Sequence, residues 1–435
     1  MEGIVRAGPI KSLLANQGRT TIIMAVDLLQ IATTTTINGV IQMNKAILAA
    51  VVSALMSTAV AADMKVGVIL GFTGPIESLT PGMADSAELA LKEASDSGKF
   101  LGGKKIEAVR ADSTCVDAAA ATAAAERLVT SDGVAAIMGA DCSGVTTAIA
   151  NNVAVPNGVV MVSPSATSPA LTTIDDKGYF FRTAPSDARQ GQVISDILIA
   201  KGVKNVAVTY TNNDYGKGLS DSFSDAFKAA GGSIAMVAAH EDGKADYSAE
   251  VGALGASGAE HLAVFGYLDQ GGKGIIQASL DSDAFDSFIL CDGMIGDSLI
   301  ESIGEDLNGA IGTLPGGATE GAAMFLEYAK SHGVDGDGPF RPESYDAGAL
   351  IALAAQAAGS MDRSAIQSKI MMVANAPGEK ILPGEIAKGL EILAGGGDID
   401  YVGATNVELN EVGEVLGSYK ELEVKNGKFE TVKIH

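Results

Sequence analysis

The sequence has no tryptophan, and aromatic residues make up only 5% of its 435 residues. A surface that stacks carbohydrate rings needs aromatic side chains, so this composition argues against such a surface. Only four histidines are present, and none stands in the H-E-x-x-H spacing of a zinc hydrolase. The three cysteines include no C-x-x-C pair, which excludes the common redox-centre motif.

Motifs of other common enzyme classes are also missing after residue 62. The sequence has no G-x-S-x-G nucleophile elbow, no G-x-x-x-x-G-K-[ST] phosphate loop and no G-x-G-x-x-G after the first expected strand. We therefore expect no catalytic residue, no metal and no cofactor. A secreted hydrolase is kept as the less favoured alternative.

Basic residues are scarce relative to acidic ones. The net charge is −23, and because the first 62 residues carry +2, the remainder carries −25. Such a chain repels nucleic acid and anionic membrane surfaces, so neither is an expected partner. Acidity also keeps an exported protein soluble. A calcium-binding role is the alternative, but the sequence contains no D-x-[DN]-x-[DN]-G loop.

A secretory signal is present, but it does not begin at the first residue. Met43-Asn44-Lys45 gives a positive start, residues 46–56 form an apolar run, and Ala59-Val60-Ala61 fits a cleavage site. A transmembrane helix needs ~20 apolar residues, more than this run contains. We expect residues 43–62 to be a signal peptide, residues 1–42 to be a misassigned upstream extension, and the protein to be periplasmic.

From residue 63 on, short apolar runs alternate with segments of helical periodicity. Strands are expected at residues 64–70, 106–110, 134–138, 159–162, 206–210, 234–237, 261–265 and 288–290. A mainly helical part follows over residues 319–393, and Asn426-Gly427 predicts a hairpin near the end. Two blocks of repeated βα units predict an α/β fold with two doubly wound, parallel-sheet lobes.

The most informative stretch covers residues 115–167. A bridge between Cys115 and Cys142 would close a loop of 28 residues and would imply an oxidising compartment. Cys291 would remain as a packed free thiol. Ser143-Gly144 follows Cys142, and Ser163-Pro164-Ser165-Ala166-Thr167 comes about one strand later. Hydroxyl and N–H groups where a strand gives way to a helix suit a small anion such as a carboxylate.

These motifs, in this order, resemble the periplasmic leucine/isoleucine/valine-binding proteins, which are type I solute receptors of ABC importers. Further motifs agree: Asp112-Ser113-Thr114-Cys115, Gly71-Phe72-Thr73-Gly74-Pro75, Phe181-Arg182-Thr183-Ala184-Pro185, Asn213-Asp214-Tyr215-Gly216-Lys217-Gly218 and Ser344-Tyr345-Asp346-Ala347. The likeness spans residues 63–435. It implies capture of an amino acid or related carboxylate by hinge closure, with the membrane permease of an ABC importer as partner. We expect a monomer.

The resemblance also implies how the chain is divided. The lobes of this family are joined by three crossovers, which would lie near residues 182–185, Leu314 and Thr405. Lobe 1 would then comprise residues 63–183 and 316–404. Lobe 2 would comprise residues 184–315 and 405–435.

The resemblance assigns a ligand site at the cleft between the lobes. Its hydroxyl and backbone groups would hold the ligand carboxylate and part of the ammonium, two tyrosines would close over the ligand, and one acid would pair with the ammonium. The residues so assigned are Ser143, Ser165, Ala166, Thr167, Tyr215, Tyr267 and Asp292. The plainer alternatives are helix caps for the hydroxyls, packing or loop positions for the tyrosines, and a turn at Asp292.

Two departures from the family pattern leave the identity of the ligand undetermined. The first loop, Gly74-Pro75-Ile76-Glu77-Ser78-Leu79-Thr80, lacks the tyrosine common in the family, and Asp292 is one methylene shorter than the usual glutamate. Glu77 is expected to face solvent, with the mouth of the cleft as the alternative. Besides a branched-chain amino acid, the ligand could be an amide or an aromatic acid, and a signalling receptor of the same fold is a further alternative.

Overall fold

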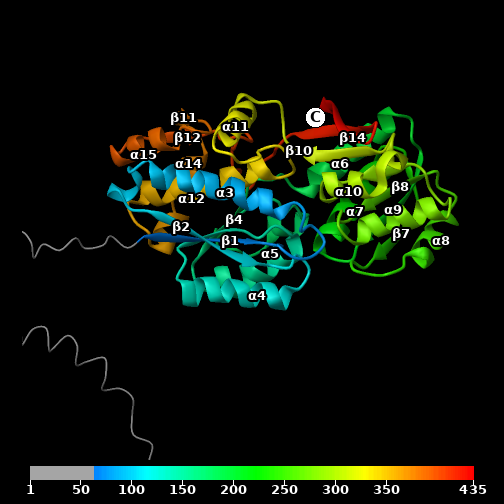
Figure 1. Ribbon diagram of the computed structural model, residues 1–435, viewed down its shortest axis with the longest axis horizontal. Helices are drawn as coiled ribbons and strands as arrows, with labels where there is room; N and C mark the ends of the chain where they lie inside the picture. Colours follow the sequence, from blue (N-terminus) through cyan, green and yellow to red (C-terminus); the bar gives the residue numbers. More distant parts are fainter. Residues whose placement is uncertain (1–62) are drawn as a thin grey trace, which may run out of the picture. The chain divides into compact units, whose positions relative to one another are not determined.

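The computed structural model of the protein describes residues 63–435. The expected upstream extension (residues 1–42) and signal peptide (residues 43–62) lie outside the described residues. Within residues 63–435, the strands form two large sheets and one two-stranded sheet. Figure 1 shows helices packed around both large sheets.

The first sheet has five parallel strands in the order β2-β1-β3-β4-β5. Its elements are β1 (Met64–Leu70), α3 (Thr80–Asp96), β2 (Ile106–Asp112), α4 (Ala118–Arg127), β3 (Ala136–Gly139), α5 (Ser143–Ile149), β4 (Val160–Ser163) and β5 (Phe180–Arg182). Every residue of β3 and β4 is buried. Helices on both faces of a parallel sheet require such continuous apolar runs, which is why these strands show no alternation in the sequence.

The second sheet has seven strands in the order β14-β13-β10-β9-β8-β6-β7. Its elements are α6 (Asp187–Ala200), β6 (Asn205–Thr211), α7 (Asp214–Ala229), β7 (Ser233–His240), α8 (Ser248–Gly255), β8 (His261–Phe265), α9 (Gly271–Asp281), β9 (Phe288–Leu290), α10 (Asp297–Ile303), β10 (Ile311–Pro315), β13 (Tyr419–Lys425) and β14 (Lys428–Ile434). The strands β6 to β10 run parallel, whereas β13 and β14 add an antiparallel hairpin at one edge.

A return segment, defined as residues 316–404, brings the chain back to the first sheet. Its elements are α11 (Glu320–Ser331), α12 (Arg341–Ala358), α13 (Arg363–Gln367), α14 (Ile370–Ala374), β11 (Glu379–Ile381), α15 (Ile386–Ala394) and β12 (Ile399–Tyr401). Helix α12 packs along α3 and reaches β3 and β4. Its residues from Glu343 to Gln356 are all buried, which explains their alanine- and leucine-rich sequence.

The chain passes between the two large sheets three times: from β5 into α6, from β10 into α11, and from β12 to β13. These three crossings and the α/β fold with two lobes confirm the expected fold class. The residue boundaries of the lobes stay a prediction, and the names lobe 1 and lobe 2 are kept for the ranges given above.

Several elements differ from the sequence-based expectation. The short strands β5, β10, β11 and β12 were not expected, because their sequences (FFR, IGTLP, EKI and IDY) include charged, glycine or proline residues and form no clear apolar run. In the part expected to be mainly helical, residues 319–393, the helical periodicity over residues 363–373 predicts one helix, but the structure has two short helices there, α13 and α14. The terminal hairpin is confirmed: Asn426 and Gly427 have φ values of 49° and 65°, as a type I′ turn requires.

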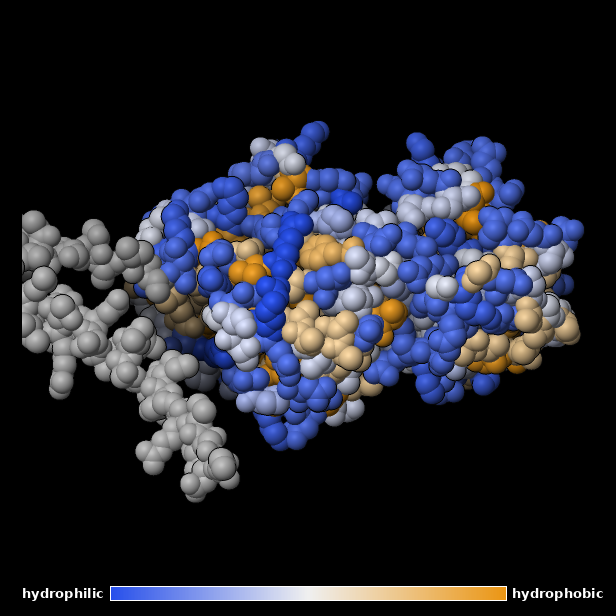
Figure 2. Space-filling model, turned by 60° about the horizontal axis from the view of Figure 1, so that its bottom comes forward, coloured by the Kyte–Doolittle hydropathy of each residue, from blue (hydrophilic) through white to orange (hydrophobic). Residues whose placement is uncertain are grey.

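The surface agrees with the acidic composition. Hydrophilic residues cover most of the face shown in Figure 2, and apolar residues form small, separate groups on it. In the part of the chain that the structure describes, no helix combines the length and the apolar character needed to cross a membrane.

Candidate functional site

An enclosed cavity lies between the two lobes, at the carboxyl ends of strands from both large sheets. It is lined by Ile76, Leu79, Met83, Asp141, Cys142, Ser143, Ser165, Tyr215, Tyr267, Asp292, Gly293 and Phe340. Its volume is about 20 Å³, which is room for about one water molecule. The strand ends of an α/β sheet are where ligands bind, so this position makes the cavity the candidate site.

Hydrogen bonds between the lobes hold the cavity closed. The Ser78 N–H donates to Asp269 Oδ2 (2.9 Å), and the Asp269 N–H donates to the Pro75 carbonyl (3.0 Å). On another side of the cavity, Ser168 Oγ donates to the Asp214 carbonyl (3.1 Å). A ligand larger than water therefore enters only when these contacts open.

The expected disulfide between Cys115 and Cys142 is present, with the Cα atoms 5.1 Å apart. Thr114 and Cys115 have φ values of 59° and 67°, a left-handed conformation that is rare for a β-branched residue. The turn is fixed by Asp112, whose Oδ1 accepts a hydrogen bond from the Thr114 N–H (2.8 Å). The bridge thus anchors the loop after β2 to the start of α5, beside the cavity.

Asp141 joins three loops on the lobe 1 side of the cavity. Its carboxylate accepts hydrogen bonds from the Gly71 N–H (2.6 Å) and from Ser113 Oγ (3.0 Å). Burial raises the pKa of Asp141, and these hydrogen bonds offset part of that rise. The sequence analysis assigned no role to Asp141.

The residues of the hydroxyl cluster have separate positions. Ser143 Oγ accepts a hydrogen bond from the Ser168 N–H (3.0 Å) and makes no capping bond to its own helix. Ser165 Oγ donates to the Asp141 carbonyl (3.1 Å). Both serines line the cavity, whereas Ala166 and Thr167 are buried and are not among its lining residues.

Arg182 fixes the shape of this loop. Its side chain is fully buried, its Nη1 donates to the carbonyls of Ala166 and Ser168 (both 3.0 Å), and its Nε donates to Glu414 (2.9 Å). Five donors on a planar guanidinium allow these bonds to form together. The first crossing therefore supports the loop that carries Ser165.

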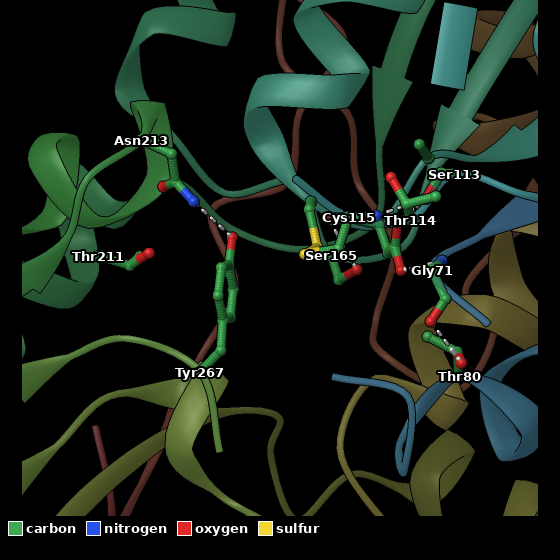
Figure 3. Close-up of a disulfide and its surroundings, with 12 residues drawn as sticks. Gly71, Thr80, Ser113, Thr114, Cys115, Ser165, Thr211, Asn213 and Tyr267 are labelled. Atoms are coloured by element: carbon green, nitrogen blue, oxygen red, sulfur yellow. Dashed lines mark hydrogen bonds between the residues drawn. A yellow bond between two sulfur atoms is a disulfide. The ribbon is translucent and has the colours of Figure 1, made fainter. Parts of the chain in front are cut away.

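Two stacked tyrosines form the lobe 2 side of the cavity. The ring centroids of Tyr215 and Tyr267 are 5.2 Å apart, and Tyr215 Oη donates to Asp292 Oδ1 (2.6 Å). Asn213 donates to Tyr267 Oη (3.4 Å); Figure 3 shows this pair on the opposite side of the site from Cys115 and Ser165. Cys291 is a buried free thiol, as expected.

A cluster of unpartnered oxygens adjoins Asp292. Both carboxyl oxygens of Asp187, Thr167 Oγ1 and Gln190 Oε1 are buried and have no hydrogen-bond partner. The Asp187 N–H donates to the Thr167 carbonyl (2.8 Å), which holds α6 against the hydroxyl cluster. Buried acceptors without donors are costly and rare, so a donor-rich cation such as an ammonium group suits this cluster.

The electrostatics of the cluster point the same way. Burial raises the pKa of Asp187 well above its ordinary value, and the nearby charge of Asp292 raises it further, while the Thr167 hydroxyl and the charge of Arg182 offset part of the rise. Burial also raises the pKa of Asp292, while the hydrogen bond from Tyr215 offsets part of the rise. Two interacting buried carboxyls retain a proton that a cation would displace. The sequence analysis missed Asp187 because an acid at the start of a helix is common.

Apolar side chains complete the cavity and were also missed. Ile76 and Leu79 come from the first loop, where the family's usual tyrosine is absent, and Met83 follows in α3. Phe340 directly precedes α12 with a φ of 59°. Glu77, between these residues, is exposed to solvent as expected.

The structure brings five of the seven assigned residues to one cavity: Ser143, Ser165, Tyr215, Tyr267 and Asp292. Ala166 and Thr167 belong to the same loop but lie behind it. Contact of any of these residues with a ligand stays a prediction. Within residues 63–435, no group of three or more His, Cys, Asp or Glu side chains could hold a metal ion.

A closed α/β protein with two lobes and a small polar-and-apolar cavity between them has the design of a solute-binding protein. The chain belongs to the periplasmic binding protein family, whose sequence profile matches residues 63–375. This confirms the family expected from the motifs, and members of this family bind solutes.

Individual relatives agree with the family assignment. A Leu/Ile/Val-binding protein homologue from Brucella melitensis is 28% identical over 320 residues, covering 72% of this chain and 84% of the relative. A leucine-specific-binding protein from Salmonella typhimurium is 28% identical over 335 residues, covering 76% and 87%. The crystal structure of a leucine-binding protein from Thermotoga maritima superposes with a TM-score of 0.71 at 26% identity, covering 85% of this chain and 98% of that one.

Proposed function

We propose that the protein is a periplasmic receptor that captures an α-amino acid with an aliphatic side chain and delivers it to the membrane permease of an ABC importer. The names of the relatives from Brucella melitensis and Salmonella typhimurium support a branched-chain amino acid. The ligand contacts are proposed for Ser143, Ser165, Ala166, Thr167, Tyr215, Tyr267 and Asp292, with Asp187 added.

The observation that carries this proposal is the opposite character of the two polar sides of one cavity. Serine hydroxyls beside the start of α5 suit a carboxylate because they add no negative charge, and the Asp141 carboxyl on the same side is already hydrogen-bonded by Gly71 and Ser113. Asp292, a buried acid that lines the cavity, suits an ammonium group because its charge would be costly without a positive partner, and the buried Asp187 beside it adds to the negative charge there. A zwitterion satisfies both sides at once.

The apolar residues restrict the side chain of the ligand. Ile76, Leu79, Met83 and Phe340 offer no hydrogen-bond partner for a charged or amide group. A polar side chain placed against them would lose its hydration without compensation, which costs about 1–3 kcal/mol. Leucine, isoleucine and valine instead gain free energy by burial at this wall.

Capture would proceed by closure of the lobes. In an open form, the strand-end residues of both lobes are accessible, and a ligand that contacts both lobes favours the closed form. The bonds that Asp269 makes to Ser78 and Pro75 across the cleft belong to a closed form whose cavity of about 20 Å³ is too small for an amino acid, so the lining side chains would have to move apart around a bound ligand. The closed surface would then be the one that the permease recognises.

Calorimetry with three matched ligands tests the proposal: leucine, 4-methylpentanoate, which lacks the ammonium group, and 3-methylbutylamine, which lacks the carboxylate. We expect leucine to bind and each truncated ligand to compete with bound leucine about 100-fold more weakly or worse, because a buried charge would be left unpaired. Glutamate should also bind poorly. Binding of 4-methylpentanoate or benzoate as tight as that of leucine would contradict an ammonium site and favour a receptor for organic acids.

A further inference from the structure

A second cavity lies where the three crossings between the lobes converge. It measures about 490 Å³, within the usual range for small-molecule sites. Its lining includes Thr183 and Pro185 from the first crossing, Gly316 and Thr319 from the second, and a third-crossing segment that contains Thr405 and Leu416. This hinge cavity shares no lining residue with the cavity between the lobes.

Glu343 gives the hinge cavity a carboxyl group, one oxygen of which has no hydrogen-bond partner in the described residues. It lines the cavity from the first turn of α12, is 2% exposed, and its buried Oε2 has no hydrogen-bond partner. Its backbone carbonyl accepts a hydrogen bond from Thr183 Oγ1 (2.8 Å), which ties it to the first crossing. Glu343 therefore brings to the wall of the cavity a carboxyl group with one oxygen that no donor of the protein satisfies, and a ligand donor that reached this carboxyl group would satisfy it.

Asp346, one turn further along α12, is a buried acid with a structural role, and its hydrogen bonding differs from that of Glu343. Its carboxylate accepts hydrogen bonds from Tyr401 Oη (2.7 Å), the Ala404 N–H (2.8 Å), and the N–H and Oγ1 of Thr405 (2.9 and 2.7 Å). These bonds fix the start of the third crossing. Since Asp346 already performs this task, Glu343 is not needed for it.

We propose that the hinge cavity is a second ligand site, which takes a small organic cation with a primary ammonium group and an apolar body, paired with Glu343. The apolar body would contact Pro185, Leu409, Val415 and Leu416, which line the same cavity. This site goes beyond the amino-acid site and does not depend on it.

Proton release accompanies binding at this site. Burial raises the pKa of Glu343 to about 8, the charge of Asp346 adds to the rise, and Lys420 on β13 partly offsets it. Glu408 also lines the cavity. At neutral pH Glu343 is therefore mostly protonated, and an incoming ammonium replaces this proton, which leaves to solvent. Affinity for the cation should rise about tenfold per pH unit up to pH 8 and level off above it.

The location predicts an effect on the lobes. The cavity is built from all three crossings, so its shape changes when the lobes rotate about them. A cation that prefers one arrangement shifts the balance between open and closed forms. By linkage, the cation must change amino-acid affinity by the same factor by which the amino acid changes cation affinity.

The test uses n-butylammonium as the probe, with butyrate and 1-butanol as matched controls for charge and apolar body. In calorimetry and thermal-shift assays without amino acid, butylammonium should bind and stabilise the protein, and the two controls should not. The Glu343→Gln variant keeps the shape of the side chain; it should lose at least about tenfold in butylammonium affinity, because a charge-assisted bond is lost, while retaining leucine binding.

Two further measurements keep the proposal open to refutation. Asp292→Asn should retain butylammonium binding, which distinguishes the hinge cavity from the ammonium side of the amino-acid site. The pH profile of the wild-type protein needs no variant and remains informative if Glu343→Gln fails to fold. Butylammonium binding that is absent, independent of pH, equalled by 1-butanol, or unchanged in Glu343→Gln would overturn the proposal.

Discussion

The two sides of the cavity between the lobes use buried carboxylates in opposite ways. On the lobe 1 side, Asp141 accepts hydrogen bonds from Gly71 and Ser113 and joins three loops. On the lobe 2 side, Asp187 has no hydrogen-bond partner on either oxygen. The difference indicates that the lobe 1 acid already has its hydrogen-bond donors, whereas the lobe 2 acid lies in a cluster, shared with Thr167 of lobe 1, that a ligand would complete.

The largest effect should come from Asp292, the acid of the lobe 2 side that lines the cavity. Asp292→Asn removes the charge and keeps the shape, so we expect leucine affinity to fall by about 100-fold or more, since breaking a buried ion pair costs about 3–5 kcal/mol. Calorimetry measures the affinity, and circular dichroism checks the fold. An unchanged affinity would remove Asp292 from the site.

The second-largest effect concerns the stability of the lobe 1 side of the cavity, which the Cys115–Cys142 disulfide anchors. In the Cys115→Ser/Cys142→Ser double variant, the loss of a 28-residue loop closure should lower the free energy of unfolding by about 3–4 kcal/mol. The melting temperature should therefore fall under oxidising conditions, and a reductant should produce a similar fall in the wild-type protein. Thiol labelling of unreduced, denatured wild-type protein should detect Cys291 alone; three reactive thiols would disprove the bridge.

Matched substitutions of the two contrasting acids separate a structural role from a ligand role. Asp141→Asn should lower stability by about 1–3 kcal/mol, because it weakens the bonds from Gly71 and Ser113. Asp187→Asn should raise the stability of the ligand-free protein, because it removes a buried carboxyl group whose charged form is disfavoured, and should weaken leucine binding about tenfold. Thermal denaturation and calorimetry of both variants provide the comparison. A loss of stability in Asp187→Asn with no change in affinity would reverse the assignment.

The smallest effect is the dependence on pH. The pKa of Asp187 is raised in the folded protein. Between the ordinary carboxyl pKa and this raised value, the Asp187 carboxyl is therefore protonated in the folded state and ionised in the unfolded state. This contribution to the stability of the ligand-free protein is present below the ordinary carboxyl pKa and is lost as pH rises through the raised value. Leucine affinity should change in the opposite direction and increase with pH, by up to about tenfold per unit. Calorimetry in buffers of different ionisation enthalpy should detect proton release, and Asp187→Asn should reduce it.

Much of the fold could be predicted from sequence because its signals are local. Apolar runs of buried strands, helical spacing and the Asn426-Gly427 turn each act over a few residues. The strands β5, β10, β11 and β12 could not, since their short sequences include charged, glycine or proline residues and carry no clear apolar run. The antiparallel position of β13 beside β10 is likewise set by contacts between residues more than 100 positions apart.

The site was predictable only where a motif marks it. Ser143, Ser165, Tyr215, Tyr267 and Asp292 follow strand ends or begin helices, and the structure brings them to one cavity. Asp187 resembles any acid in a first helical turn, and its lack of partners is visible only in three dimensions. Phe340 reaches the cavity through a left-handed backbone conformation that its local sequence does not indicate.

Arg182 has a consequence for how this protein can diversify. Its one side chain binds both the loop behind the amino-acid cavity and Glu414 in the third crossing. A lysine at position 182 would keep the charge but not the several N–H donors of the planar guanidinium group. Even this conservative substitution would therefore disturb both ligand binding and the movement of the lobes. Natural variants with new preferences should therefore retain arginine at 182 and differ at Ile76, Leu79 or Phe340.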